Sequence, residues 1–144
     1  MEDILQLKIL QLLSDHRLMT IATLREDGWP HATTVAFVSD GMTLYFLCEP
    51  QSQKALNLAR DQRISLTIDG DTARPAGVAG LSMAARAHAV DDPTEVAKVR
   101  ALLTARSPEY TGHTAKLRAF RVTPELISLI EYSKGFAHAE LVTV

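Results

Sequence analysis

The sequence has little cysteine, no long apolar run and no excess of one charge, and each shortage excludes a class of protein. Its single cysteine, Cys48, cannot form a disulfide within the chain, which is compatible with a reducing cytoplasm. No apolar run approaches the roughly 20 residues that a membrane span needs, and the start Met1-Glu2-Asp3 lacks the basic region of a secretory signal. We therefore expect a cytoplasmic protein with no membrane partner.

The charges are nearly balanced and mixed along the chain. The 15 Lys and Arg residues against 17 Asp and Glu residues give a net charge of −2. Proteins that bind the phosphate backbone of nucleic acids usually carry a basic stripe, so we expect no nucleic-acid partner. A chain of 144 residues has the length of one domain and can bury a core without disulfides or metals. A single domain over residues 1–144 is predicted.

Common catalytic and metal-binding motifs are also missing. The five histidines are scattered, without HExxH spacing or a cysteine pair, so no metal site is expected. There is no P-loop, and Gly77 and Gly80 do not form a dinucleotide fingerprint. Ser82 lies in a continuing strand pattern, whereas a nucleophile elbow needs a sharp turn from a strand into a helix. ATP binding, Rossmann-type NAD binding and hydrolase activity are therefore disfavoured.

Hydrophobic periodicity predicts about eight short strands and three helices. Apolar residues at helical spacing indicate helices over residues 2–14, about 52–60 and about 93–106. Alternating or short apolar runs indicate strands over 18–24, 63–69, 81–90, 117–122, 126–132 and 138–144, with a loop over 69–80. Between them, residues 30–48 read as two strands joined by a tight turn at 39–41. In 32–38 both alternating sets of side chains are apolar or small, which predicts a strand covered on both faces.

These elements predict a mainly β fold, a small antiparallel barrel with peripheral helices (α+β). A barrel of this size fills its interior with side chains, so a sizeable ligand must bind on the outside or between two chains. A homodimer is therefore expected.

The loop Ser52-Gln53-Lys54 opens the second predicted helix. A helix start leaves backbone N–H groups unpaired and carries partial positive charge, so it favours an anion. A lysine in the first turn opposes that dipole, and Lys54 is better explained if a phosphate lies among the loop residues. The alternative is that Lys54 is a solvated surface lysine and Ser52 an ordinary N-cap.

Several segments of the chain resemble one known family in the same order. They are Pro30-His31-Ala32-Thr33-Thr34-Val35, Leu44-Tyr45-Phe46, Ser52-Gln53-Lys54-Ala55-Leu56-Asn57-Leu58, Arg63-Ile64-Ser65-Leu66, Ala85-Arg86-Ala87 and Tyr132-Ser133-Lys134-Gly135-Phe136-Ala137-His138. Together they resemble the pyridoxamine 5'-phosphate oxidase-like family of FMN-binding split barrels over nearly the whole chain.

The resemblance implies a split β-barrel homodimer with two FMN sites at the interface. Residues matching Thr33, Thr34 and Val35 run along the flavin ring and ribityl chain, and the loop of Ser52, Gln53 and Lys54 holds the phosphate. Phe46 packs near the cofactor or in the core. Arg86 and the segment 134–138 reach the flavin of the second chain or are surface groups. The cofactor-binding residues implied are therefore Thr33, Thr34, Val35, Phe46, Ser52, Gln53, Lys54 and Arg86.

The sequence departs from the oxidases of this family at the places that bind charge. Gln53 stands where an arginine is common, and Val38 stands where the oxidases have a basic residue. The arginine-rich C-terminal segment that holds the vitamin substrate is absent. Pyridoxamine phosphate oxidation itself is not expected.

The leading prediction is an FMN-dependent oxidoreductase that transfers hydride through flavin N5 to or from a small-molecule substrate, with no side chain acting as acid or base. Four alternatives stay open. One is a barrel that binds the deazaflavin F420, whose longer acidic tail calls for more basic residues. Another is a haem-binding barrel with His138 or His113 as axial ligand. The third is a non-catalytic flavin-binding protein, and the fourth is an unliganded dimer that keeps the fold.

Overall fold

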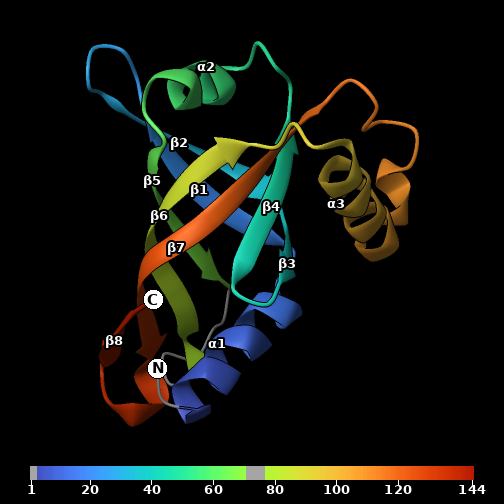
Figure 1. The fold of residues 1–144 in the computed structure, drawn as a ribbon. Coiled ribbons are helices and arrows are strands. Elements are labelled where there is room, and N and C mark those ends of the chain that lie inside the picture. Colours follow the sequence, from blue (N-terminus) through green and yellow to red (C-terminus); the bar gives the residue numbers. More distant parts are fainter. Residues whose placement is uncertain (1–2, 71–76) are drawn as a thin grey trace.

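The computed structural model describes residues 3–70 and 77–144, which form one antiparallel sheet and three helices (Figure 1). The strands are β1 (Leu18–Leu24), β2 (Pro30–Ala36), β3 (Val38–Asp40), β4 (Thr43–Cys48), β5 (Arg63–Asp69), β6 (Ala79–Ala89), β7 (Arg118–Glu131) and β8 (Ala139–Thr143). The helices are α1 (Asp3–Asp15), α2 (Gln53–Arg60) and α3 (Pro93–Arg106), with short 3-10 turns at Pro108–Tyr110 and Tyr132–Lys134.

The strand order makes the sheet curl into a barrel. Its order is β2-β1-β5-β6-β7-β4-β3, and β8 adds to β7. The two end strands, β2 and β3, are separated in the chain only by Phe37, so the backbone itself joins the two ends of the sheet. Phe37 is 1% exposed and fills the interior at this junction. The predicted mainly β split barrel with peripheral helices is confirmed.

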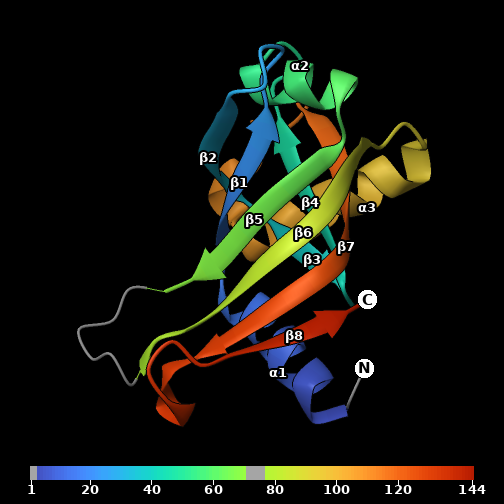
Figure 2. The same cartoon turned by 90° about the vertical axis from the view of Figure 1, so that its left-hand side faces the viewer.

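The helices lie at the two ends and on one flank of the barrel (Figure 1). The helix α1 covers the end near β8 and contributes Ile9 and Leu13 to the core, while α2 covers the opposite end with Ala55 and Leu58. On the flank beside β3 and β4, α3 packs through a second apolar cluster: Val38, Tyr45, Val90, Val99, Leu103 and Ala119. The described helices leave the outer face of β1, β5 and β6 open (Figure 2).

The predicted strands at 18–24 and 63–69 coincide with β1 and β5, whose alternation of apolar and polar residues is regular. The prediction of two strands at 117–122 and 126–132 is wrong, because β7 runs through both. Pro124 lacks an N–H, which normally ends a central strand. Here the register shifts between Ala84 and Ala85, so the irregularity of a bulge accommodates the proline.

Two further expectations need correction. The turn predicted at 39–41 is shifted, because Ser39 and Asp40 belong to β3 and the turn passes through Gly41, whose φ is +61°. The prediction that 32–38 is covered on both faces is wrong within one chain, since Ala32 and Thr34 of β2 are exposed. The side chains on both sides of β2 are mostly small, and those of Ala32 and Thr34 on its outer side stay exposed in one chain.

Parts of two predictions lie outside the described residues. They are the first residue of the predicted helix at 2–14 and residues 71–76 of the predicted loop at 69–80. Within the described ranges, no helix has the length and apolar character needed to cross a membrane.

Candidate functional site

The start of α2 has the local geometry that the sequence predicts. Ser52 is extended and caps the helix, with its Oγ accepting the N–H of Ala55 at 3.2 Å and its backbone oxygen accepting the N–H of Leu56 at 3.0 Å. The N–H groups of Gln53 and Lys54 have no hydrogen-bond acceptor among the residues described. Two donors and the positive end of the helix are therefore available at this point.

Lys54 is buried, so its assignment as a solvated surface lysine is wrong. Its residue exposure is 8%, and its Nζ donates to Thr33 Oγ1 at 2.8 Å. Within residues 3–70 and 77–144, no carboxylate oxygen lies within 4.0 Å of this ammonium. A buried charge with only one neutral partner is costly, and an added anion would relieve that cost.

The helix α2 is held on the barrel by a polar residue that sequence reasoning missed. Asn57 is 0% exposed and its Nδ2 donates to Thr23 Oγ1 at 2.9 Å. Its Oδ1 accepts from Gln53 Nε2 at 2.8 Å, so the Gln53 amide is used within the helix. Arg60 adds a bond to the Leu24 carbonyl at 2.9 Å. The one available signal was Asn57 itself, a polar residue between two leucines of the predicted helix.

His31 is a second residue near this site that the sequence did not single out. It alternates with Thr33 along β2, so both side chains leave the same side of the strand, and it pairs with the buried Thr23 of β1. Its Nδ1 is buried without a hydrogen-bond partner. The polar side chains of β1 and β2 therefore gather beneath α2.

Cys48 ends β4 close to the same loop and is buried. Burial raises the pKa of the Cys48 thiol, although a hydrogen bond with Ser52 and the charge of Lys54 act in the opposite direction. A thiol with a raised pKa is protonated near neutral pH, so Cys48 is not an activated nucleophile.

Thr34 and Val35 lie at a cavity, whereas Phe46 lies in the core. Thr34 and Val35 line a cavity of about 260 Å³ together with Leu47 and Leu103. Phe46 is 0% exposed and stacks on Phe120 with ring centroids 5.2 Å apart. Of the two roles that the sequence left open for Phe46, packing in the core is the one that the structure supports.

Arg86 lies on the outer face of the sheet, away from the loop of Lys54. Its Nε donates to Glu125 Oε1 at 2.6 Å, and its side chain is 48% exposed. Across the ladder it pairs with Arg63, which binds Asp61 at 2.7 Å and holds the pKa of that carboxyl at about 2. Within one chain, Arg86 is therefore not brought to the other predicted residues.

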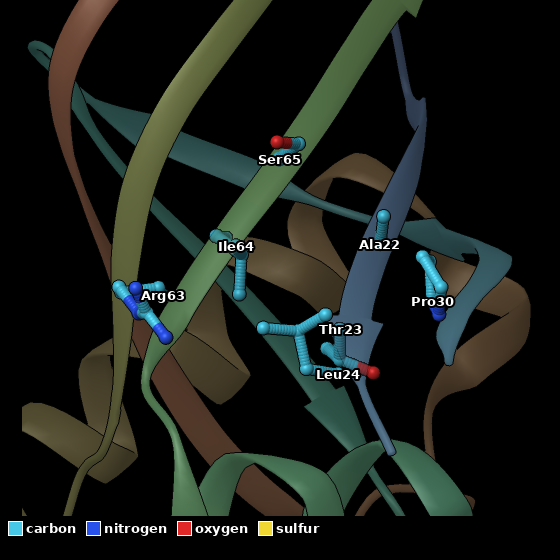
Figure 3. Close-up of a pocket in the computed structure, with 7 residues that line it drawn as sticks. All are labelled: Ala22, Thr23, Leu24, Pro30, Arg63, Ile64 and Ser65. Atoms are coloured by element: carbon cyan, nitrogen blue, oxygen red, sulfur yellow. The ribbon is translucent and has the colours of Figure 1, made fainter. Parts of the chain in front are cut away.

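A hollow of about 250 Å³ opens on this outer face (Figure 3). Arg63 marks one side of it on β5 and Pro30 of β2 the other, with Ala22 of β1 between the strands. The complete lining is Ala22, Thr23, Leu24, Pro30, Arg63, Ile64 and Ser65. Its floor is made mainly of small or apolar side chains.

The segment 134–138 forms an exposed turn held by ion pairs. Lys134 Nζ lies 3.1 Å from Glu140 Oε1, and His138 Nε2 lies 3.1 Å from the same oxygen. Phe136 is 88% exposed and packs edge-on against Tyr132. The predicted role of this segment therefore requires a second chain.

Comparison with known proteins identifies the family. The family model for pyridoxamine 5'-phosphate oxidase matches residues 5–131, and the chain belongs to this family. No curated protein sequence matches the chain significantly.

Solved structures show the same fold at low sequence identity. A Clostridium acetobutylicum protein related to general stress protein 26, of the pyridoxinephosphate oxidase family, aligns with a TM-score of 0.78 at 13% identity, over 100% of this chain and 97% of its own. HutZ, the haem storage protein of Vibrio cholerae, aligns with a TM-score of 0.72 at 21% identity, over 82% and 88%. A haem-binding protein of Mycobacterium smegmatis aligns with a TM-score of 0.79 at 20% identity, over 92% of this chain and 55% of its own.

Proposed function

We propose that this chain binds FMN as a homodimer and acts as a flavin-dependent oxidoreductase on a small molecule. The observation that carries the proposal is Lys54, a residue 8% exposed at the start of α2, whose ammonium has the Thr33 hydroxyl as its hydrogen-bond partner and no carboxylate nearby in the described residues. A phosphate would supply the missing negative charge. The same group would accept the two N–H donors of the loop and meet the positive end of the helix.

The residues present fit a phosphate monoester better than a longer acidic tail. A second surface hollow lies beside Gln53, distinct from the one in Figure 3. Its other lining residues are Arg25, Glu26 and Asp27. These two acids would repel the acidic tail of F420. FMN ends at its phosphate and avoids them, so we favour FMN over F420.

Haem is a second candidate, because two of the structural neighbours are named as haem proteins. In this chain the Nε2 atom of His138 contacts a Glu140 oxygen at 3.1 Å, so binding iron through that nitrogen would break the pair. The other candidate ligand, His113, is exposed in a loop. In the described part of the chain neither histidine lines the cavity of Thr34 and Val35 or the hollow on the outer face of the sheet, and we favour FMN.

When bound, FMN would supply the hydride chemistry at N5. The chain would position the cofactor. Lys54, Thr33 and the N–H groups at the start of α2 would hold the phosphate, and the strand segment Thr34-Val35 would run beside the ring system, next to the cavity that it lines. No side chain is proposed as a catalytic acid or base.

The second chain is proposed to cover the open outer face of the sheet (Figure 2). Two rows of paired residues cross this face: Thr34, Thr20, Thr67 and Ser82 in one, and Ala32, Ala22, Ser65 and Ala84 in the other. All are small, so the face is flat and a second sheet can approach it closely. Arg86 lies on the same side of β6 and would then face the partner.

The test is a titration of FMN-free protein with FMN, followed by flavin fluorescence, for the natural chain and for Lys54→Met. We expect binding by the natural chain, at least a hundredfold weaker binding by Lys54→Met, and yellow colour that sediments at the mass of a dimer. Lys116→Met is the control, because Lys116 is exposed and its replacement removes the same charge. Equal FMN affinity in Lys54→Met and the control would refute the phosphate site.

A further inference from the structure

The cavity beside Thr34 and Val35 is lined by apolar and uncharged polar residues in the part of the chain that the structure describes. It lies between β2, β4, α3 and the loop after α3, and its volume is about 260 Å³. Its lining residues are Thr34, Val35, Ala36, Leu47, Leu103 and Thr114. Among these described residues none is ionisable, and their side-chain polar groups are the two threonine hydroxyls.

Two cations on this flank, Arg121 and Lys98, are each paired with a carboxylate of the same chain. Arg121 Nη1 lies 2.8 Å from Glu95 Oε1, and Glu95 also accepts the Tyr45 hydroxyl at 2.9 Å. Lys98 pairs with Asp40. These two cations are therefore neutralised within the chain, while Arg100 of α3 donates to the carbonyl oxygens of Ala115 and Leu117.

The residue at the start of the neighbouring strand β3 adds no charge to the cavity. Val38, two residues after Ala36, is 3% exposed and packs in the apolar cluster under α3 with Val99 and Leu103. Leu103 belongs both to this cluster and to the cavity wall. The cavity wall is thus continuous with an apolar core, and the residues described in that wall offer no counter-charge.

From these observations we infer that the substrate is a small, uncharged and mainly apolar molecule, whose one or two polar atoms bond to the hydroxyls of Thr34 and Thr114. This inference rests on the proposed function, because the cavity shares Thr34 and Val35 with the flavin site. An anionic substrate would lose its hydration against apolar walls without gaining a charged partner, and that loss disfavours binding. The volume is just below the range of about 300–1,000 Å³ for ligand pockets, which limits the substrate to a small molecule.

The test uses two probes of nearly the same shape, 2-acetylnaphthalene and 2-naphthoate. They differ mainly in one group, a neutral methyl ketone against a carboxylate. Binding to the FMN-free and FMN-loaded protein is measured by saturation-transfer NMR. We expect the ketone to bind at least tenfold more tightly than the carboxylate in both states.

Substitutions in the loop after α3 test whether the ketone binds in this cavity. Thr114→Trp fills the cavity and is expected to abolish ketone binding, while Thr114→Val removes one hydroxyl and is expected to weaken it several-fold. Thr111→Trp places the same bulk at an exposed position of the same loop and should leave binding unchanged. If Thr114→Trp fails to fold, Thr114→Val still decides the question.

The outcomes separate the two proposals. Equal or tighter binding of 2-naphthoate, no binding of the ketone, or ketone binding unaffected by the change at Thr114 would overturn the substrate class, even if FMN binds as proposed. Selective ketone binding by a protein that takes up no FMN would confirm the cavity's preference. The flavin function, and the role of the cavity as its substrate site, would then fail.

Discussion

Replacing Lys54 by methionine should make the FMN-free protein more stable while removing its response to FMN. Methionine keeps the length and apolar stem of lysine but carries no charge. The residue is 8% exposed and its ammonium has one neutral hydroxyl as partner in the described residues, so the folded natural chain carries an uncompensated desolvation cost. That cost disappears in the variant.

The size of the effect follows from two opposing contributions. Loss of the bond from Nζ to Thr33 Oγ1, 2.8 Å long, costs the variant about 1–1.5 kcal/mol. Relief of the buried charge, which is worth several kcal/mol per ion when burial is complete, returns roughly 2–3 kcal/mol here because the group retains some exposure. The net gain is about 0.5–2 kcal/mol, equivalent to a rise in Tm of roughly 2–7 °C for a domain of this size.

The assay is urea and thermal unfolding of FMN-free protein at one fixed protein concentration, repeated with FMN. Ligand at 100 times its Kd should stabilise the natural chain by about 2.7 kcal/mol, whereas Lys54→Met should gain little. The order of stability should therefore reverse when FMN is added. An FMN-free Lys54→Met protein less stable than the natural chain would show that the lysine is satisfied by the fold, and the reasoning from its unpaired charge would be wrong.

Three other predictions concern the core, pH and assembly. Phe46→Ala should lower the free energy of unfolding by about 3–5 kcal/mol in chemical denaturation, because the ring is fully buried; a loss below 1 kcal/mol would contradict its place in the core. The hydrogen bond from the Tyr45 hydroxyl and the nearby cations lower the pKa of Glu95 in the folded protein. Its carboxylate therefore stabilises the fold at pH values above the unfolded pKa of about 4.3. This contribution is lost as the pH falls through the lower pKa of the folded state. Glu95→Gln should thus cost about 1 kcal/mol at pH 7, a difference that shrinks toward zero below pH 3, and a cost independent of pH would refute the assignment. Ala84→Arg places a large charge on the outer face of the sheet and should raise the dimer dissociation constant, measured by sedimentation, at least a hundredfold. Ala105→Arg, at an exposed position of α3, should leave that constant unchanged. A dimer that tolerates Ala84→Arg would be formed through another face of the chain.

Local patterns were enough to predict most elements and the family. The regular alternation in β1 and β5 and the cap at Ser52 are short-range features, because strand pairing surfaces and helix starts depend on neighbouring residues. The segments that resemble the family were correctly assigned, as the match over residues 5–131 shows. The error at Pro124 arose because a proline normally breaks a strand, and only the paired strand reveals the bulge that accommodates it.

The tertiary structure decided what lies around each side chain. Sequence alone placed Lys54 at a helix start, but its burial and its bond to Thr33 depend on a contact 21 positions away along the chain. The same holds for the unpartnered Nδ1 of His31 and for the position of Asn57 against Thr23. Local sequence determines which way a residue points along its own element. What that residue meets is decided by strand order and helix docking, which depend on packing of the whole chain.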